Sequence, residues 1–426
     1  MARWPKPPEG SWTEHYPELG TEDVSYEDSI SPEFFELERE AIFRRAWLNV
    51  GRVEQLPRAG SYFTKELAVA RTSIVVVRDR EGTVRAFHNL CRHRGNKLVW
   101  QDFPGVETSG TCRQFTCKYH GWRYDLDGAC SFVQQEGEFF GLDKGDYGLV
   151  PVHCAVWEGF VFVNLAEEPE QSLPEFLGPM ITSLEGYPFE RMTERWLYRS
   201  EVKANWKIYM DAFQEFYHAP VLHQRQNPAK FAAPWRDAGF EAPHYRIDGP
   251  HRLVSTAGIR AWELADDMRK PIEGACRSGL FGPWDAPDLG VDTLPSGVNP
   301  AHCDPWGLDS FQLFPNFTIL LWGQGWYLTY HYWPTAADRH VFEGTLYFVP
   351  SRTARERVAH ELSAVSFKEF GLQDASTLEA TQSMLESRVV SRFPLNDQEV
   401  LCRHLHKETA KWVDDYLRGG VGAVRS

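Results

Sequence analysis

Two short segments, each holding one cysteine and one histidine, most constrain how this chain can fold. The first is Cys91-x-His93 in "CRHRGNKL" and the second is Cys117-x-x-His120 in "CKYHGW". The chain has 426 residues and 8 cysteines, and "MARWPKPPEG" lacks the apolar core of a secretory signal. Because the cytosol keeps thiols reduced, clustered cysteines indicate metal ligands rather than disulfides. A fold that brings the two segments together would form a site with four ligands.

Two kinds of metal centre fit these four residues. Two cysteines and two histidines can bind a structural zinc ion as a tetrahedron. They can also hold a Rieske [2Fe–2S] cluster, in which two thiolates bind one iron and two imidazoles bind the other. Zinc fingers usually place both cysteines in one knuckle and both histidines in another, whereas each segment here offers one of each. The mixed segments favour the asymmetric dinuclear cluster.

The residues that flank the two segments carry a family resemblance. The Arg-Gly after His93 and the Tyr-His-Gly-Trp around His120 resemble the paired motifs of Rieske non-haem iron oxygenases. One departure is that 23 residues separate His93 from Cys117, more than that family usually has. We place the surplus in "DFPGVETSGTCRQ" and expect Cys112 within it to be a bystander. Cys130 is expected to be a small buried side chain.

Strand and helix patterns divide the chain into two regions. Residues 45–165 contain short strands and turn residues, including a hairpin over 73–89, and predict an all-β module. The acidic, proline-rich stretch 167–176 looks like a boundary. Helical and strand patterns alternate beyond it and predict an α+β domain on an antiparallel sheet. We expect helices at 31–48, 205–218, 371–391 and 397–417, and strands at 314–322 and 326–334.

The resemblance implies a matching order of domains. It implies an all-β Rieske [2Fe–2S] domain over 45–165 and a helix-grip catalytic domain with a central antiparallel sheet over 166–426. Residues 1–44 are expected to form an N-terminal segment that packs on the catalytic domain. The predicted fold class is therefore α+β.

A second metal motif follows in "NWKIYMDAFQEFYHAPVLH". His218 and His223 resemble the His-x4-His pair of the family's mononuclear Fe(II) site, which typically uses two histidines and one carboxylate. In an ideal helix the two side chains would point about 140° apart, so we expect Pro220 to interrupt the helix. The resemblance of "GLQDASTLEATQSMLESR" implies Asp374 as the third ligand. The competing carboxylates are Glu379 and Asp397.

Two acidic residues precede the histidine pair. Glu215 lies three residues before His218, on the same helical face. The resemblance implies that a carboxylate here joins the iron-bound histidine to a Rieske histidine, His120, of the neighbouring subunit, and a trimer closes such a ring. Many ring-dihydroxylating members have Asp at this position, and Glu occurs in others, including oxygenases that act on quaternary amines. Asp211 either contacts the iron site indirectly or is a capping or solvated residue.

The sequence also indicates residues of the substrate pocket and a class of reaction. Ala219, Phe317 and Phe370 are candidates to face the substrate, beside aromatic strands, and an apolar lining favours an aromatic or polycyclic substrate. The resemblance implies a terminal oxygenase α subunit that uses O2, in a homotrimer or an α3β3 complex. Ring hydroxylation or cis-dihydroxylation in aromatic hydrocarbon catabolism is the leading expectation. Oxidative N- or O-demethylation is the alternative, and a Rieske protein that only transfers electrons is the second alternative.

Charge and composition restrict the partners. The chain has 45 Lys+Arg and 59 Asp+Glu, a net charge of −14, which argues against nucleic acid. It lacks both the run of about 18 apolar residues that a membrane helix needs and a dinucleotide-binding glycine pattern. We therefore expect a cytoplasmic protein whose NAD(P)H electrons arrive through a separate flavin reductase or ferredoxin. Six basic residues near the cluster segments either steer an acidic redox partner or offset the cluster's charge; they are Arg92, Arg94, Lys97, Arg113, Lys118 and Arg123.

Overall fold

The computed structural model describes residues 11–223, 242–258 and 270–419, and the chain divides into two compact units. The β unit comprises residues 43–176, and the α/β unit comprises residues 1–42 and 177–426. The division at 176 falls at the end of the acidic, proline-rich stretch.

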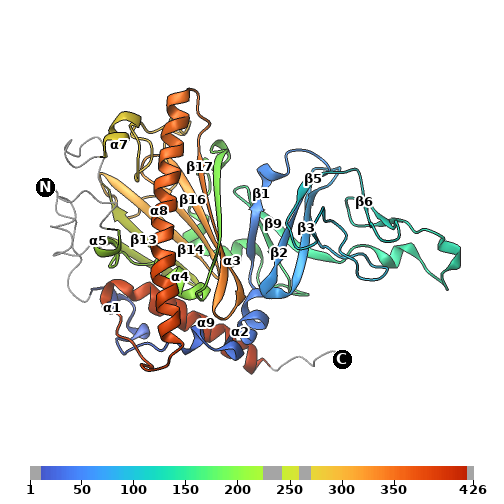
Figure 1. Cartoon of the computed structure of the whole chain (residues 1–426), viewed down its shortest axis with the longest axis horizontal. Helices are drawn as coiled ribbons and strands as arrows, with labels where there is room; N and C mark the ends of the chain where they lie inside the picture. Colours follow the sequence, from blue (N-terminus) through green and yellow to red (C-terminus); the bar gives the residue numbers. More distant parts are fainter. Residues whose placement is uncertain (1–10, 224–241, 259–269, 420–426) are drawn as a thin grey trace. The chain divides into compact units, whose positions relative to one another are not determined.

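The β unit is built from antiparallel strands. Its larger sheet has the order β1-β10-β9-β4-β3-β2-β5, and a small sheet has the order β6-β7-β8 (Figure 1). The predicted hairpin is present, because β3 and β4 pair antiparallel across a turn with Gly82 at φ 90°. The strands are β1 (Leu48–Arg52), β2 (Ser61–Leu67), β3 (Thr72–Arg78), β4 (Val84–His88), β5 (Ser109–Thr111), β6 (Phe115–Thr116), β7 (Arg123–Tyr124), β8 (Cys130–Phe132), β9 (Pro151–Trp157) and β10 (Phe160–Asn164).

Both cysteines of the mixed segments belong to the hydrophobic core of the β unit. Cys91 and Cys117 are buried together with Trp122 and Tyr124, and Val75 from β3 lies in the same cluster. Burial of large aromatic side chains contributes most to such a core. The loops that carry the cysteines are therefore held by packing as well as by hydrogen bonds.

The α/β unit is organised around one antiparallel sheet with the order β11-β17-β16-β15-β14-β13-β12. Aromatic and β-branched residues, which favour strands, fill β15 and β16. The strands are β11 (Glu194–Val202), β12 (His244–Asp248), β13 (His251–Ala257), β14 (Trp306–Leu313), β15 (Phe317–Trp322), β16 (Trp326–Ala336) and β17 (Arg339–Phe348). The predicted strands at 314–322 and 326–334 are confirmed, with β15 starting three residues later and β16 ending two residues later than expected.

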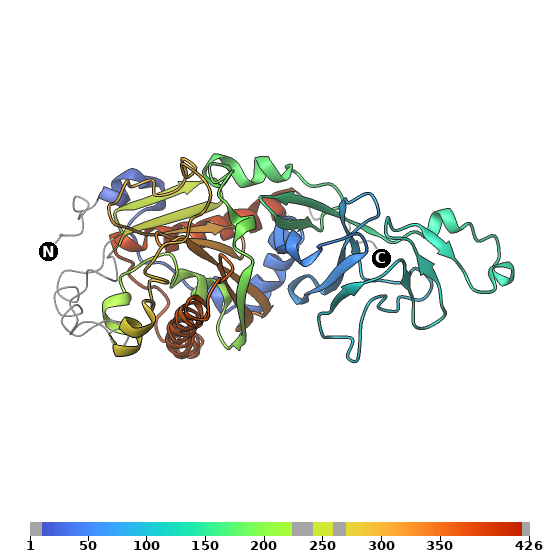
Figure 2. The ribbon, with the colours of Figure 1, turned by 90° about the horizontal axis from the view of Figure 1, so that it is seen from above.

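A long helix, α8 (Ala354–Leu385), runs across one face of this sheet (Figure 1), and the view in Figure 2 looks nearly along its axis. Thr353 caps its first turn by accepting a hydrogen bond from the Glu356 N–H at 3.1 Å. The ring of Phe367 packs edge-on against Trp322 and Trp326, with centroids 5.3 and 5.1 Å away. These contacts define the α8 face of the sheet.

The other helices of the described chain are short, apart from one near the C-terminus. These helices are α1 (Ser11–His15), α2 (Pro32–Glu38), α3 (Leu173–Thr182), α4 (Trp206–Asp211), α5 (Ala219–Leu222), α7 (Pro271–Cys276) and α9 (Val400–Arg418). None of the helices in the described ranges is both long and apolar enough to cross a membrane.

Three helix predictions need correction. The helix expected over 31–48 ends early, because α2 passes into a π-helical turn over Arg39–Phe43 and β1 starts at Leu48. The helix expected over 371–391 is the second half of α8, whose first half the sequence pattern missed. The helix expected over 205–218 stops at Asp211, and a turn leads to α5. Pro220 therefore lies in the first turn of a separate helix rather than breaking one.

Candidate metal centres

The two cysteine–histidine segments of the β unit form loops of the same kind. In each loop the cysteine carbonyl accepts a hydrogen bond from the glycine N–H four residues later, at 3.1 Å for Gly95 and 3.0 Å for Gly121. Each cysteine N–H donates to the carbonyl five residues later, at 2.8 Å in both loops. Gly95 and Gly121 have φ values of 72° and 73°, a conformation that favours glycine. The two glycines explain why each segment continues into Gly.

The loops bring the two histidines together and bury both thiols in one core cluster. The Nδ1 atoms of His93 and His120 lie 3.1 Å apart, and the Cys91 thiol lies 3.3 Å from the Tyr124 hydroxyl. The side-chain amide of Asn96 lies 3.6 Å from the Cys117 sulfur. Burial, His120 and Arg94 lower the pKa of His93, which keeps its imidazole in the neutral form that binds metal.

This donor set fits a dinuclear iron–sulfur cluster. Two imidazole nitrogens that face one point suit one iron, and two buried thiols suit the other. Of the other two cysteines of this unit named above, Cys130 lies in the hydrophobic core, and Cys112 packs against it.

A second group of donors lies in the α/β unit. Within the described ranges, His218, His223 and Asp374 are the residues whose possible ligand atoms all lie within 4.8 Å of one another. His218 and His223 flank the short helix α5, and Asp374 lies in the middle of α8. Residues about 150 positions apart in the sequence thus meet, as the resemblance implied.

Hydrogen bonds orient both histidines. The Nδ1 atom of His218 lies 2.5 Å from a carboxylate oxygen of Glu215, and the Nδ1 atom of His223 lies 2.8 Å from the side-chain oxygen of Gln373. Their Nε2 atoms lie 3.8 and 3.4 Å from the same oxygen of Asp374, Oδ1. Burial opposes protonation of His218, but Glu215 outweighs it and raises the pKa of this imidazole.

The three donors fit a metal ion. Asp374 is 1% exposed, and its Oδ1 atom has no hydrogen-bond partner. An unpartnered buried carboxylate oxygen is costly unless a cation satisfies it. Two imidazole nitrogens aimed at that oxygen complete the two-histidine, one-carboxylate set that binds non-haem Fe(II).

An open cleft of about 290 Å³ borders this group. Its lining includes Glu215 and His218 on one side, Leu378 of α8 on another, and Glu399 at the start of α9. Burial and the nearby carboxylate of Glu215 raise the pKa of Glu399 to about 7. Glu215 is thus within reach of a molecule that docks at the cleft.

The predicted pocket residues separate into two sets. Phe370 packs on His223 with ring centroids 4.3 Å apart, and Ala219 begins α5 next to His218. Phe317 was expected beside them. It lies opposite His331 in the pairing of β15 with β16, and the two ring centroids are 4.6 Å apart. Strand alternation places both on the sheet face opposite α8, whereas Thr318 and Tyr330 share the α8 face. Phe317 therefore does not line a pocket on that face.

Other aromatic rings occupy the α8 face beside the metal group. Phe213 contacts Tyr330 at 4.7 Å, and Tyr209 contacts Phe342 at 4.8 Å between ring centroids. The Tyr209 hydroxyl donates to the carbonyl of Gly371, one helical turn before Asp374, at 2.9 Å. These rings form a candidate substrate wall.

The carboxylates that competed with Asp374 have other partners. Glu379 accepts a hydrogen bond from the Lys203 N–H at 3.0 Å, and Asp397 accepts one from the Thr13 N–H at 2.9 Å. Neither of these two carboxylates belongs to the metal group. Asp211, the candidate for an indirect contact with the iron site, lies 3.1 Å from the Nε2 atom of His406 and lines the same cleft as His218 and Asp374.

Comparison with known families decides the identity of the chain. The family model described as the ring hydroxylating alpha subunit (catalytic domain) matches residues 189–415, more than half of the chain. The Rieske [2Fe-2S] domain model matches residues 46–147. The chain belongs to the ring-hydroxylating α-subunit family of Rieske oxygenases.

Several curated relatives of this Rieske oxygenase chain are named as monooxygenases. It is 36% identical over 193 residues to the glycine betaine monooxygenase oxygenase subunit of Chromohalobacter salexigens, covering 45% of this chain and 41% of that protein. It is 33% identical over 217 residues to the chloroplastic choline monooxygenase of Spinacia oleracea, covering 49% and 47%. The matches thus span less than half of these relatives' length.

Solved structures confirm the α+β fold of a Rieske oxygenase. A quaternary ammonium Rieske monooxygenase superposes with a TM-score of 0.72 at 19% identity, over 96% of this chain and 100% of the other. Naphthalene 1,2-dioxygenase from Rhodococcus sp. superposes with a TM-score of 0.69 at 19% identity, over 92% and 94%. The fold is therefore shared by enzymes named for quite different substrates.

The sequence motifs did not identify three residues that lie near the iron group or near its neighbours. Gln373 orients His223, and its position directly before Asp374 was an available signal. Glu399 borders the cleft from the 3-10 turn Asp397–Glu399 directly before α9, and His406 contacts Asp211 from within α9. The sequence pattern presents this whole stretch as an ordinary amphipathic helix.

Proposed function

We propose that this chain is the terminal oxygenase α subunit of a multicomponent monooxygenase. The observation that carries the proposal is that the rings of His218 and His223 lie beside one buried, unpartnered oxygen of Asp374. The same chain also has a Rieske domain. The reaction would use one O2, two electrons and two protons to convert a C–H bond into C–OH, with one water as the second product.

The residues that would hold the two metal centres follow from the donor sets. Cys91, His93, Cys117 and His120 would bind the [2Fe–2S] cluster, and the histidine–histidine–aspartate group would bind Fe(II). When bound, the cluster would supply single electrons and the iron would supply O2 activation. The chain itself orients the donors, through Glu215 and Gln373, and excludes water from Asp374.

Glu215 would also connect neighbouring subunits. Its carboxylate already accepts from the backbone N–H of His218 at 3.1 Å and contacts the ring of the same residue. A remaining lone pair could accept a hydrogen bond from His120 of the partner subunit through the cleft, in a homotrimer or an α3β3 complex. The structure of the quaternary ammonium Rieske monooxygenase is said to reveal insights into inter-subunit electron transfer in that protein, which supports this arrangement.

The proposed substrate class is a quaternary amine rather than an aromatic hydrocarbon. The sequence alone favoured ring hydroxylation, but relatives of at least 30% identity are named for glycine betaine, carnitine and choline. The rings of Phe213, Tyr330 and Phe342 lie beside the metal group, with Tyr330 and Phe342 5.1 Å apart. Aromatic faces attract quaternary ammonium groups through cation–π interactions.

An acidic redox protein is the proposed electron donor. Of the six basic residues near the cluster loops, Arg92 and Lys97 are engaged with the Gly148 carbonyl at 2.8 Å and with Glu66 at 2.6 Å. Arg94 and Lys118 are exposed and lie over aromatic rings. Exposed cations around a redox centre favour association with a negatively charged ferredoxin or reductase. We place this reaction in the cytoplasm, where the thiol ligands stay reduced.

The predicted domain limits of 1–44, 45–165 and 166–426 are retained as proposals. The contact division at 176 and the Rieske match that ends at 147 bracket the proposed boundary at 165.

A single-turnover assay tests the substrate class. Protein reduced with dithionite under argon is mixed with oxygenated buffer that contains glycine betaine, carnitine, choline or naphthalene. We expect a quaternary amine to accelerate cluster oxidation and to give a hydroxylated product; hydroxylation of an N-methyl group would release formaldehyde, the nitrogen keeping the bonding electron pair. Product from naphthalene alone would return the assignment to ring hydroxylation. Cluster oxidation that no substrate accelerates would favour an electron-transfer protein.

A further inference from the structure

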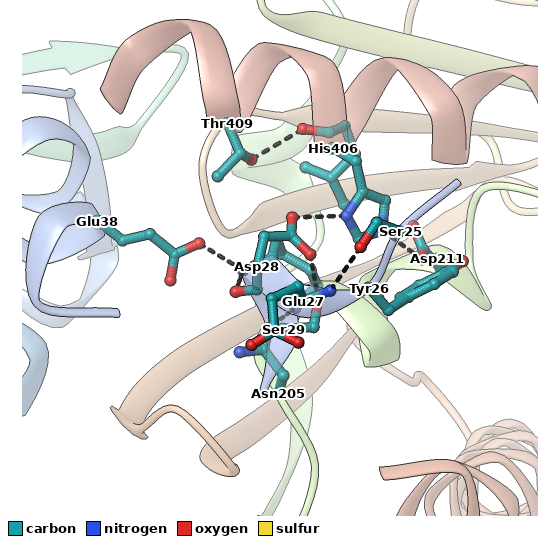
Figure 3. A network of polar contacts seen from close by, with 12 residues as sticks. Ser25, Tyr26, Glu27, Asp28, Ser29, Glu38, Asn205, Asp211, His406 and Thr409 are labelled. Atoms are coloured by element: carbon teal, nitrogen blue, oxygen red, sulfur yellow. Dashed lines mark hydrogen bonds and ion pairs between the residues drawn. The ribbon is translucent and has the colours of Figure 1, made fainter. Parts of the chain in front are cut away.

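His406 of α9 lies between the carboxylates of two aspartates of the α/β unit (Figure 3). Its Nδ1 atom is 2.7 Å from Asp28 and its Nε2 atom is 3.1 Å from Asp211. Carboxylate oxygens only accept hydrogen bonds, so both ring nitrogens carry protons and the ring is an imidazolium. Burial favours the neutral ring, but the two carboxylates outweigh it and raise the pKa of His406 to about 10. At neutral pH His406 is therefore the cation between the two aspartates, and the three side chains are called the triad below.

The Asp28 end of the triad is fixed to the body of the unit. Asp28 accepts from the Ser29 hydroxyl at 3.0 Å, and its backbone carbonyl accepts from the Lys207 ammonium at 3.0 Å. Lys207 is fully buried and forms an ion pair with Glu38 of α2. Because several elements hold Asp28, the imidazolium bound to it has a defined position.

The Asp211 end of the triad is connected to the proposed iron site through the turn that follows Asp211. Asp211 is the last residue of α4, and its carboxylate accepts from the Tyr26 hydroxyl and from the Gln214 side-chain amide, both at 3.3 Å. The Gln214 N–H also donates to the Asp211 carbonyl at 3.0 Å. Glu215 follows Gln214, and its carboxylate is hydrogen-bonded to the Nδ1 atom of His218. The Asp211 side chain thus holds the start of the turn that carries Glu215.

We propose that His406 is a positioning residue for the oxygenase reaction: its imidazolium holds Asp211 against Asp28 and thereby fixes Glu215 against His218. This inference rests on the function proposed above. Without the imidazolium, the carboxylates of Asp28 and Asp211 would lose the cation that lies between them, although Lys207 would still act on Asp28 and Arg252 on Asp211. The turn that follows Asp211 would then move to relieve the repulsion between the two carboxylates. Small displacements of groups that orient a reacting centre cost large factors in rate.

A purely structural role for the triad makes a different prediction. A buried ion triad can simply tie the N-terminal segment to α9, and its loss would then lower the melting temperature without changing turnover. A positioning role lowers kcat while the KM for substrate, the iron content and the cluster spectrum are retained.

The test compares His406→Gln with Asp397→Asn in the full chain with both metal centres. Asp397 tethers the same N-terminal segment through Thr13 but is not part of the triad, so it is a matched control. With the quaternary amine that is active in the substrate assay, we expect His406→Gln to lower kcat at least tenfold. Substrate KM should change less than about twofold, iron content should be unchanged, and Asp397→Asn should behave as wild type. Unchanged kcat with a lower melting temperature would overturn the inference.

A second variant decides the matter if His406→Gln does not fold. Tyr26→Phe removes one hydrogen bond to Asp211 and leaves every charge in place, and we expect kcat to fall about threefold. An unchanged kcat in this variant would overturn the inference. Inactivity of wild-type protein with every quaternary amine would instead refute the proposed substrate class, and the inference would fall with it.

Discussion

Replacement of Asp374 by alanine is expected to remove about one iron per chain and to abolish product formation. Asp374 Oδ1 is the atom at which both histidine Nε2 atoms converge, and it has no other partner. Two neutral imidazoles alone bind Fe(II) weakly, because the carboxylate supplies the negative charge of the set. The cluster lies in the other unit and should keep its visible absorption. Iron analysis and the absorption spectrum of the purified variant measure both effects.

Two further variants make this prediction specific. His223→Ala should give the same loss of iron, because it removes a second donor from the same group. Glu379→Ala is the matched control: it removes a carboxylate from the same helix, five residues away, that is bonded to the Lys203 N–H. If Glu379→Ala loses the iron and Asp374→Ala retains it, the ligand assignment is wrong.

Replacement of Glu215 by alanine is expected to leave both metal centres bound and to uncouple them. Glu215 does not belong to the converging donor group, but it orients His218 and borders the cleft. Without its carboxylate, the proposed hydrogen-bonded connection to His120 of the partner subunit is broken. We expect product formed per reduced cluster in a single turnover to fall by at least about 10²-fold, with iron content unchanged.

Glu215→Asp serves as the conservative comparison. It keeps the charge with a shorter side chain, so it should retain part of the activity that Glu215→Ala loses. Normal turnover in Glu215→Ala would count against the connecting role. A loss of iron in that variant would show instead that Glu215 acts by holding His218 in place for the metal.

Local residue order explains the loops of the two cysteine–histidine segments better than it explains the helices of the α/β unit. The mixed cysteine–histidine segments lie in loops closed by local hydrogen bonds, so local residue order largely determines their shape. The same holds for the hairpin around Gly82. In contrast, Asp374 reaches the histidines only because α8 crosses the sheet, a long-range arrangement that the family resemblance implied and helical periodicity did not.

Two errors have identifiable physical causes. The pattern over 205–218 suited a continuous helix, but α4 ends at Asp211, and the N–H groups of Phe213 and Gln214 bond the carbonyls three residues earlier instead of four. The Asp211 side chain is engaged there by His406 and Tyr26, from distant parts of the chain that local periodicity does not reveal. Phe317 has the composition of a pocket residue, yet strand parity places it on the opposite face. A shift of one residue in a strand reverses the face, so composition alone does not assign it.

Metal analysis of the wild-type protein tests the central claim most directly. Two iron centres in one chain require three irons and two acid-labile sulfides per polypeptide, together with the broad visible absorption of a [2Fe–2S] cluster. The account predicts this composition for protein purified without oxygen and reconstituted with ferrous iron. Colourless protein that holds zinc, or coloured protein that holds two irons and binds no third, would contradict it.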